Sequence, residues 1–337
     1  MLQQIVQDRR AWTGNSLGGQ DALVVPLESK HLAAFDECLR RLPDRELPLR
    51  SIGRAAYRHP VLDALFSEVL EELRDGRGIV LLRRLPVERF SRAEIDLIYW
   101  GIGTHLGAGV SQSVLGDMIG EVRDMTPDDP HARAYRNKQE LTLHTDLCDI
   151  IGMLSMQPAM TGGVSSYASV YAVHNRILET RPDLLAPLYA GFNYHRRGEE
   201  GPGEAPITPH KVPLFAYQDG QLSARYVRSY LTSAMDAMKV SDPRLIEALD
   251  LFDSTADELA VKFVLQPGEI TLINNMTVMH SRTAFEDWPE KSRKRLLLRL
   301  WLTHSGFRST PPEFRIYGSS EGIEKVEGKQ PSFAGIE

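Results

Sequence analysis

Leu141-Thr142-Leu143-His144-Thr145-Asp146 is the stretch on which the fold and chemistry of this chain depend. On an extended chain, side chains two residues apart project to the same side, so His144 and Asp146 would lie together. On a helix the same two side chains would lie about 200° apart around the axis and could not share one metal ion. The stretch therefore indicates a strand that carries two metal ligands. For His-x-Asp alone, a solvated pair of side chains is the alternative.

A second histidine far along the chain strengthens this pattern. His280 ends an apolar run that follows a predicted strand and turn at 269–275. Two histidines and one carboxylate on one face of an octahedron are typical of non-haem Fe(II) sites, and they leave positions open for other ligands. We therefore expect His144, Asp146 and His280 to bind one metal ion. A core histidine satisfied by hydrogen bonds is the alternative for His280.

Residues 295–302 predict a strand with two different faces. The first face carries Leu296, Leu298, Leu300 and Leu302, and the second carries Arg295, Leu297, Arg299 and Trp301. Two arginines on a buried face are costly unless they meet anions. Either this face lines an anion-binding site or it is exposed to solvent. Trp301 is interpreted as a core residue.

The rest of the chain predicts short strands flanked by helices. Apolar residues recur at helical spacing over 30–42 and 62–73, and a capping box opens a helix at 91–107. After residue 110, short apolar or β-branched runs alternate with Gly, Pro, Asn and Asp, which is typical of β structure. Strands are expected at 78–82, 150–156, 165–170, 212–217, 260–265, 269–273 and 296–302, with helical segments near 174–190 and 243–252.

No linker or repeat divides the chain, so we expect a single domain over residues 1–337. Its helical N-terminal part would cover about 1–75 and its core about 76–304. The segment 305–337 is rich in Gly, Pro and Ser, which predicts a C-terminal arm or a loosely ordered end.

Composition excludes several classes of protein. The 337 residues include 39 Lys and Arg against 45 Asp and Glu, a formal net charge of −6, and 42% are hydrophobic. A disordered chain would be less hydrophobic, and a nucleic-acid-binding protein would carry a basic footprint. No apolar run approaches the roughly 20 residues of a membrane helix. The N-terminus lacks a secretory apolar segment, and only two cysteines occur. We expect a cytoplasmic protein without nucleic-acid or membrane partners.

Taken together, these motifs resemble the taurine dioxygenase and clavaminate synthase-like family of Fe(II)/2-oxoglutarate-dependent oxygenases. His144 and Asp146 match the first two metal ligands of that family, and His280 matches the distal ligand. Gly162-Gly163-Val164-Ser165 matches its Gly-Gly-x-Thr/Ser motif. The resemblance extends over roughly residues 75–315. It implies a mainly β fold with flanking helices, built on a double-stranded β-helix, or jelly-roll, core.

The resemblance also implies roles for three further residues. Arg295 follows the distal histidine by 15 residues and matches the arginine that pairs with the C-5 carboxylate of 2-oxoglutarate. Ser165 matches the hydroxyl residue that helps to hold this co-substrate, and Arg299 matches a second arginine that faces co-substrate or substrate. The implied reaction consumes O2 and 2-oxoglutarate and releases succinate and CO2. A carboxylate at Asp146 favours hydroxylation, while desaturation and cyclisation stay open.

Five further residues are candidates, and four of them have two interpretations each. Gln112 stands where relatives line the pocket, and Glu140 stands where the taurine enzyme contacts its substrate, but Glu140 is equally well a solvated carboxylate. Arg225 and Arg228 either recognise an anionic substrate or belong to a solvated face. Asn275 either holds the metal loop through side-chain hydrogen bonds or is an ordinary turn residue.

The expected substrate is a small polar or carboxylate-bearing metabolite, such as an amino-acid derivative, and homo-oligomerisation stays open. Two other functions remain. A metal-dependent hydrolase would use the same ligands to activate water. A non-catalytic metal-binding module of the same fold would retain the core without producing succinate.

Overall fold

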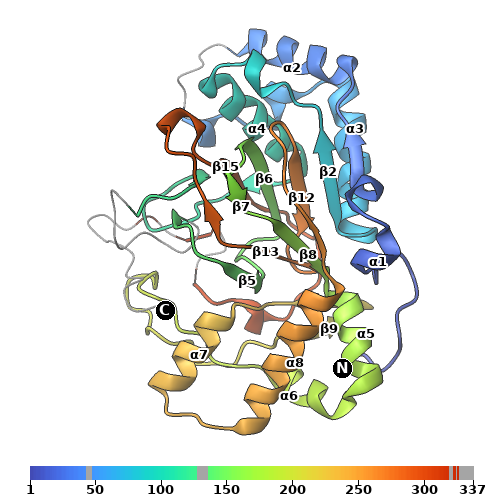
Figure 1. Ribbon diagram of the computed structural model, residues 1–337, viewed down its shortest axis with the longest axis vertical. Helices are drawn as coiled ribbons and strands as arrows, with labels where there is room; N and C mark the ends of the chain where they lie inside the picture. Colours follow the sequence, from blue (N-terminus) through green and yellow to red (C-terminus); the bar gives the residue numbers. More distant parts are fainter. Residues whose placement is uncertain (43–47, 127–135, 319–321, 324, 326–337) are drawn as a thin grey trace.

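The computed structural model describes residues 1–42, 48–126, 136–318, 322, 323 and 325. Two sheets lie at its centre and helices lie on the outside (Figure 1). In this described part of the chain, no helix has both the length and the apolar character needed to cross a membrane.

The larger sheet has seven strands in the order β1-β2-β12-β6-β15-β3, with β4 also paired to β15. All its pairs are antiparallel except β1 with β2. The strands are β1 (Val24–Pro26), β2 (Ile79–Arg83), β3 (Ala108–Gly109), β4 (Ile119–Val122), β6 (Ile150–Gln157), β12 (Ile270–Asn274) and β15 (Leu296–Thr303).

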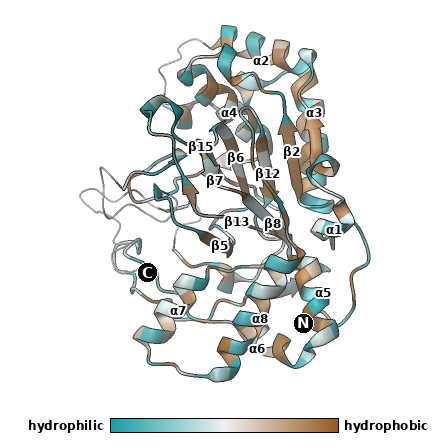
Figure 2. Cartoon of the chain, in the orientation of Figure 1, coloured by the Kyte–Doolittle hydropathy of each residue, from teal (hydrophilic) through white to brown (hydrophobic). Residues whose placement is uncertain are grey.

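Both faces of this sheet are buried. Leu298, Leu300 and Leu302 belong to a cluster shared with the N-terminal helices, whereas Leu297 and Trp301 belong to the cluster between the sheets. The predicted alternation along 295–302 is confirmed, and its arginine face is buried rather than exposed. Figure 2 shows apolar residues concentrated along β2 and β12.

The smaller sheet has four antiparallel strands in the order β11-β8-β13-β5. They are β5 (Leu141–His144), β8 (Ser165–Ser169), β11 (Val261–Phe263) and β13 (Val278–Arg282). The Tyr167 hydroxyl on β8 lies 2.9 Å from the Thr271 hydroxyl on β12, so polar side chains of the two sheets meet in the interior. Two further antiparallel pairs are β7 (Thr161–Gly162) with β14 (Phe285–Glu286), which are distant in sequence, and the hairpin of β9 (Phe215–Gln218) with β10 (Gln221–Ala224).

Helices cover the sheets in two groups (Figure 1). The outer face of the larger sheet packs against α3 (Pro60–Asp75) and α4 (Arg92–Leu106), and α2 (Ser29–Arg41) packs on these two helices. The helices at the other end are α5 (Val170–Thr180), α6 (Leu185–Ala190), α7 (Arg228–Ala237) and α8 (Pro243–Leu259), while the short α1 (Gly14–Leu17) lies near β11.

Most predicted elements are found, and the exceptions have local causes. The capping box before α4 is formed by Ser91 and Glu94. The segment 174–190 is divided into α5 and α6, because Pro182 opens a separate 3-10 turn. The predicted strand at 212–217 begins three residues later, at Phe215.

The C-terminal arm is tied down where the structure describes it. Phe307, Phe314 and Ile316 are buried, and Gly322 bridges to Ser111. The described part of this segment therefore packs against the core rather than forming a loose end. Residues 319–321, 324 and 326–337 of the arm lie outside the described residues.

Candidate metal centre

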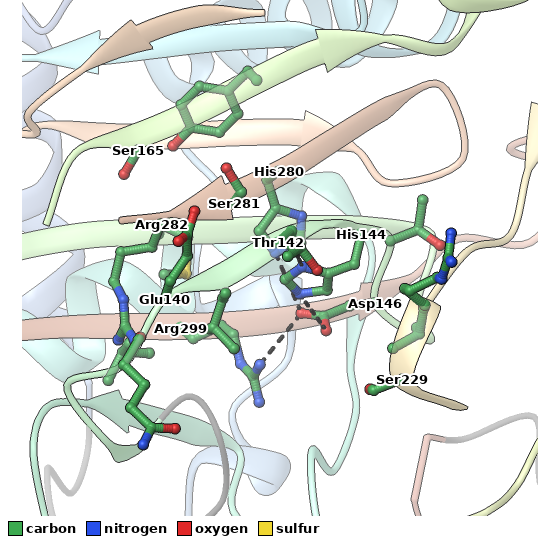
Figure 3. Close-up of a pocket in the computed structure, with 18 of the residues that line it drawn as sticks. Glu140, Thr142, His144, Asp146, Ser165, Ser229, His280, Ser281, Arg282 and Arg299 are labelled. Carbon is green, nitrogen blue, oxygen red and sulfur yellow. Dashed lines mark hydrogen bonds and ion pairs between the residues drawn. The ribbon is translucent and has the colours of Figure 1, made fainter. Parts of the chain in front are cut away.

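Strand pairing brings two of the three predicted metal ligands together, and Asp146 joins them from the segment just after β5, outside the predicted strand. His144 ends β5 and is the register partner of His280 on β13, and the ring centroids lie 4.3 Å apart. Asp146 Oδ1 lies 3.7 Å from His144 Nε2, and Asp146 Oδ2 lies 3.8 Å from His280 Nε2. One possible ligand atom from each of the three residues lies within 4.8 Å of the other two. Among the described residues, no other group of three or more His, Cys, Asp or Glu side chains is this close together. Figure 3 shows the three side chains converging.

The protonation states suit a cation. Burial opposes the charge on Asp146, but Arg299, the two histidines and Trp301 outweigh it and hold its pKa at about 2. Burial and the neighbouring His144 lower the pKa of His280 to about 3, so the imidazole is neutral at pH 7. His144 Nδ1 lies 2.8 Å from the Thr142 carbonyl oxygen, which leaves its Nε2 as the free lone pair. One carboxylate and two imidazole nitrogens fit a divalent transition metal.

The alternative for His280 does not fit the structure. Its Nδ1 is buried and has no hydrogen-bond partner among the described residues. Its Nε2 faces the Asp146 carboxylate at a distance too long for a hydrogen bond. His280 is therefore not a core histidine satisfied by hydrogen bonds.

The Asp146 carboxylate is held from the larger sheet. Trp301 Nε1 donates to Asp146 Oδ2 at 2.9 Å, and Arg299 Nη1 approaches the same oxygen at 3.3 Å. Gln112 Oε1 in turn accepts from Arg299 Nε at 2.7 Å. Sequence reasoning missed Trp301, because an apolar alternation marks the buried face without showing what lies opposite.

The Asp146 backbone is held from the turn after β12. Asn275 Oδ1 accepts from the Asp146 amide at 2.8 Å, and Asn275 Nδ2 donates to the carbonyls of Asp146 and Cys148 at 2.6 and 2.8 Å. The Asn275 amide also donates to the Asp149 carbonyl at 2.9 Å. Of the two interpretations of Asn275, the structure supports the one in which it holds the metal loop.

Asn275→Ala is expected to weaken binding of a divalent metal about 10- to 100-fold, as losses of ligand-supporting contacts typically do. It is also expected to lower the free energy of unfolding by about 2–4 kcal/mol, because buried backbone groups lose their partners. Metal competition assays and denaturant titration measure the two effects. Asn274→Ala is the matched control, since Asn274 is equally buried but its side chain binds Leu73 and Met276. Equal metal affinities in the two variants would contradict the assignment.

A cavity of about 400 Å³ opens onto the three ligands. Ser165, Arg295 and Arg299, the residues expected to hold a co-substrate, line this cavity. Glu140, the residue directly before β5, lines the cavity too (Figure 3). A cavity of this volume suits small molecules.

Arg295 lines the cavity and lies beside the glycine motif. A Cβ on Gly163 would stand 3.2 Å from Arg295 Nε, and Gly163 has a φ of +64°, so glycine makes room for the guanidinium here. Burial and the nearby Arg282 lower the pKa of Arg295 to about 9. Both guanidinium groups lie 4.9 Å from the Phe285 ring centroid. An anion bound here would relieve this concentration of buried positive charge.

Of three other candidate residues, two lie outside the cavity lining and the third is engaged in ion pairs. Gln112 does not line the cavity, because it is fully buried behind Arg299 and also donates to the Arg299 carbonyl at 2.8 Å. Gln112 was expected to contact substrate, but its side chain instead holds Arg299 in place. Arg225 is neither solvated nor in the cavity lining, since it is buried and donates to the Asp146 carbonyl. Arg228 reaches the lining but forms ion pairs with Asp250 and Asp253.

Comparison with known proteins places this site in a family. The family model described as taurine catabolism dioxygenase TauD, TfdA family matches residues 44–301. The chain belongs to the TauD/TfdA dioxygenase family. The predicted resemblance to taurine dioxygenase is thereby confirmed. The matched segment contains His144, Asp146 and His280.

Two curated relatives extend over most of the chain. FR-33289 synthase from Streptomyces rubellomurinus is 30% identical over 320 residues, which cover 92% of this TauD/TfdA member and 94% of the relative. The taurine hydroxylase-like protein SAT17 from Stachybotrys chartarum is 26% identical over 313 residues, which cover 88% and 79% of the two chains.

Solved structures share the fold of this TauD/TfdA member at low sequence identity. An asparagine oxygenase in complex with Fe(II), 2S,3S-3-hydroxyasparagine and succinate superposes with a TM-score of 0.64 at 17% identity, covering 83% of this chain and 93% of that one. The non-heme iron oxygenase OrfP in complex with Fe, succinate and (3S)-hydroxy-L-Arg gives a TM-score of 0.64 at 15% identity, covering 90% and 99%.

Proposed function

We propose that this protein is a non-haem Fe(II)- and 2-oxoglutarate-dependent dioxygenase that hydroxylates an unactivated C–H bond of a small molecule. The observation that carries the proposal is the cluster of His144, Asp146 and His280 at a cavity that also contains a buried arginine, Arg295. Family membership and the iron- and succinate-containing structures of fold relatives support it.

The roles follow from position. His144, Asp146 and His280 would hold Fe(II), while Ser165 and Arg295 would hold the distal carboxylate of 2-oxoglutarate. Arg299 would support metal binding indirectly, because its guanidinium pairs with the Asp146 carboxylate. When bound, ferrous iron and 2-oxoglutarate together activate O2 for attack on the substrate C–H bond, with release of succinate and CO2. The two facing sheets support a jelly-roll core as the scaffold.

The substrate class proposed is an amino acid or a similar metabolite that bears a carboxylate. The cavity has the volume of a small-molecule site, and the fold relatives are described with hydroxyasparagine and hydroxyarginine. Glu140 lines the cavity as an acidic group that could pair with a substrate ammonium.

Anaerobic titration of the metal-free protein with Fe(II) and 2-oxoglutarate tests the proposal. We expect a visible charge-transfer band that requires both additions and is absent in His280→Ala, which lacks one ligand. His304→Ala is the control, since His304 does not line the cavity. Tight metal binding with no response to 2-oxoglutarate would favour a hydrolase or a non-catalytic module instead.

A further inference from the structure

The two oxygens of the Asp146 carboxylate have unequal environments. Oδ2 accepts the indole N–H of Trp301 and also meets the Arg299 guanidinium. Among the described residues, no hydrogen bond reaches Oδ1. A carboxylate oxygen that already accepts two donors is a poorer metal ligand than its neighbour. The asymmetry leaves Oδ1 as the better donor to a metal ion.

Trp301 is itself rigidly held. It is 2% exposed on β15, where it pairs with Ile151 of the adjacent strand. The Arg299 guanidinium lies over its ring at 4.8 Å, and Arg299 is fixed by Gln112. The indole has one donor and no acceptor, so its only polar atom is committed to Asp146. A purely apolar role would leave the buried indole N–H without a partner, a cost that a residue without a polar atom avoids.

We propose that Trp301 is a positioning residue that fixes the Asp146 carboxylate through Oδ2, so that Asp146 binds the metal through Oδ1 alone. The inference rests on the proposed Fe(II) site and extends it to a residue outside the ligand set. Arg299 supplies charge to the same oxygen, whereas Trp301 supplies direction, because a buried indole N–H has a single orientation. Without that bond the carboxylate could rotate and present both oxygens to the metal.

Trp301→Phe removes the N–H and keeps most of the buried ring. We expect the Fe(II) dissociation constant, measured anaerobically by competition with a chromophoric chelator, to rise about 10- to 100-fold. We also expect the charge-transfer band of the complex with Fe(II) and 2-oxoglutarate to shift in energy, because the carboxylate ligand changes its mode of binding. Neither readout depends on turnover.

Trp100→Phe is the matched control. Trp100 is similarly buried, and its Nε1 donates to the Ile52 carbonyl at 2.8 Å in the other core cluster. It should lose a comparable hydrogen bond without changing Fe(II) affinity or the band. If Trp301→Phe fails to fold, Trp301→benzothienylalanine replaces the N–H by sulfur while retaining the two-ring shape.

The outcomes separate the two proposals. Wild-type protein that does not bind Fe(II) would overturn the proposed function and this inference with it. If the wild-type protein binds Fe(II) and the Trp301 variant binds it with the same affinity within twofold and an unshifted charge-transfer band, this inference alone is overturned. Weakened binding and a shifted band in the Trp301 variant, but not in the Trp100 variant, would support it.

Discussion

Replacing Asp146 with alanine is expected to abolish oxidation of 2-oxoglutarate to succinate, with a loss of at least about a hundredfold, because one of three metal ligands disappears. The same change leaves the Arg299 guanidinium buried without its carboxylate. Breaking a buried ion pair from one side costs about 3–5 kcal/mol of folding free energy. Succinate production, Fe(II) affinity and denaturant titration together measure these losses.

Asp146→Asn separates the two consequences. The amide keeps the shape of the side chain and can still accept from Trp301 through its oxygen, but it is a neutral and weaker ligand. We expect most of the metal affinity to be lost while more of the folding free energy is retained than in Asp146→Ala. Undiminished succinate production in either variant would remove Asp146 from the ligand set.

Replacing Arg295 with methionine is expected to raise the dissociation constant for 2-oxoglutarate by about one to two orders of magnitude, because a charge-assisted pairing is lost. Methionine keeps much of the buried volume, and the lost charge was already disfavoured by burial and by Arg282. The Fe(II) affinity is therefore expected to change little. Anaerobic titration with 2-oxoglutarate at saturating Fe(II) measures the effect.

Arg299→Met provides the contrast. Arg299 contacts the Asp146 carboxylate rather than the glycine motif, so this variant should weaken Fe(II) binding more than 2-oxoglutarate binding. The opposite result, with Arg295→Met affecting metal and Arg299→Met affecting co-substrate, would show that the roles of the two arginines had been exchanged.

Local patterns predicted much of this site. The i, i+2 spacing of His144 and Asp146 predicted one strand with both ligands, but β5 ends at His144 and Asp146 lies two residues beyond it. Alternation along 295–302 placed Arg295 and Arg299 on one face of a strand, and the structure shows that this face is buried. The second inference succeeded because it depends on one element and its period.

The residues that were missed or misplaced depend on contacts between distant elements. Trp301 was interpreted as core, yet its N–H meets Asp146 across the interior. Arg225 was interpreted as facing solvent or an anionic substrate, yet it is buried against the Asp146 backbone. Gln112 was expected at the substrate and instead supports Arg299. A single sequence carries no signal for which strand lies opposite which loop, so such contacts appear only in the folded chain.

The register pairing of His144 with His280 couples the metal to folding itself. The two strands come from distant parts of the chain, so the ligand set exists only after β5 and β13 have joined. A metal that binds the native state and not the unfolded chain stabilises by mass action, by about 2.7 kcal/mol at a free concentration of one hundred times its dissociation constant. The midpoint of thermal unfolding then rises with free Fe(II), so the supply of iron affects the stability of the fold as well as its reactivity.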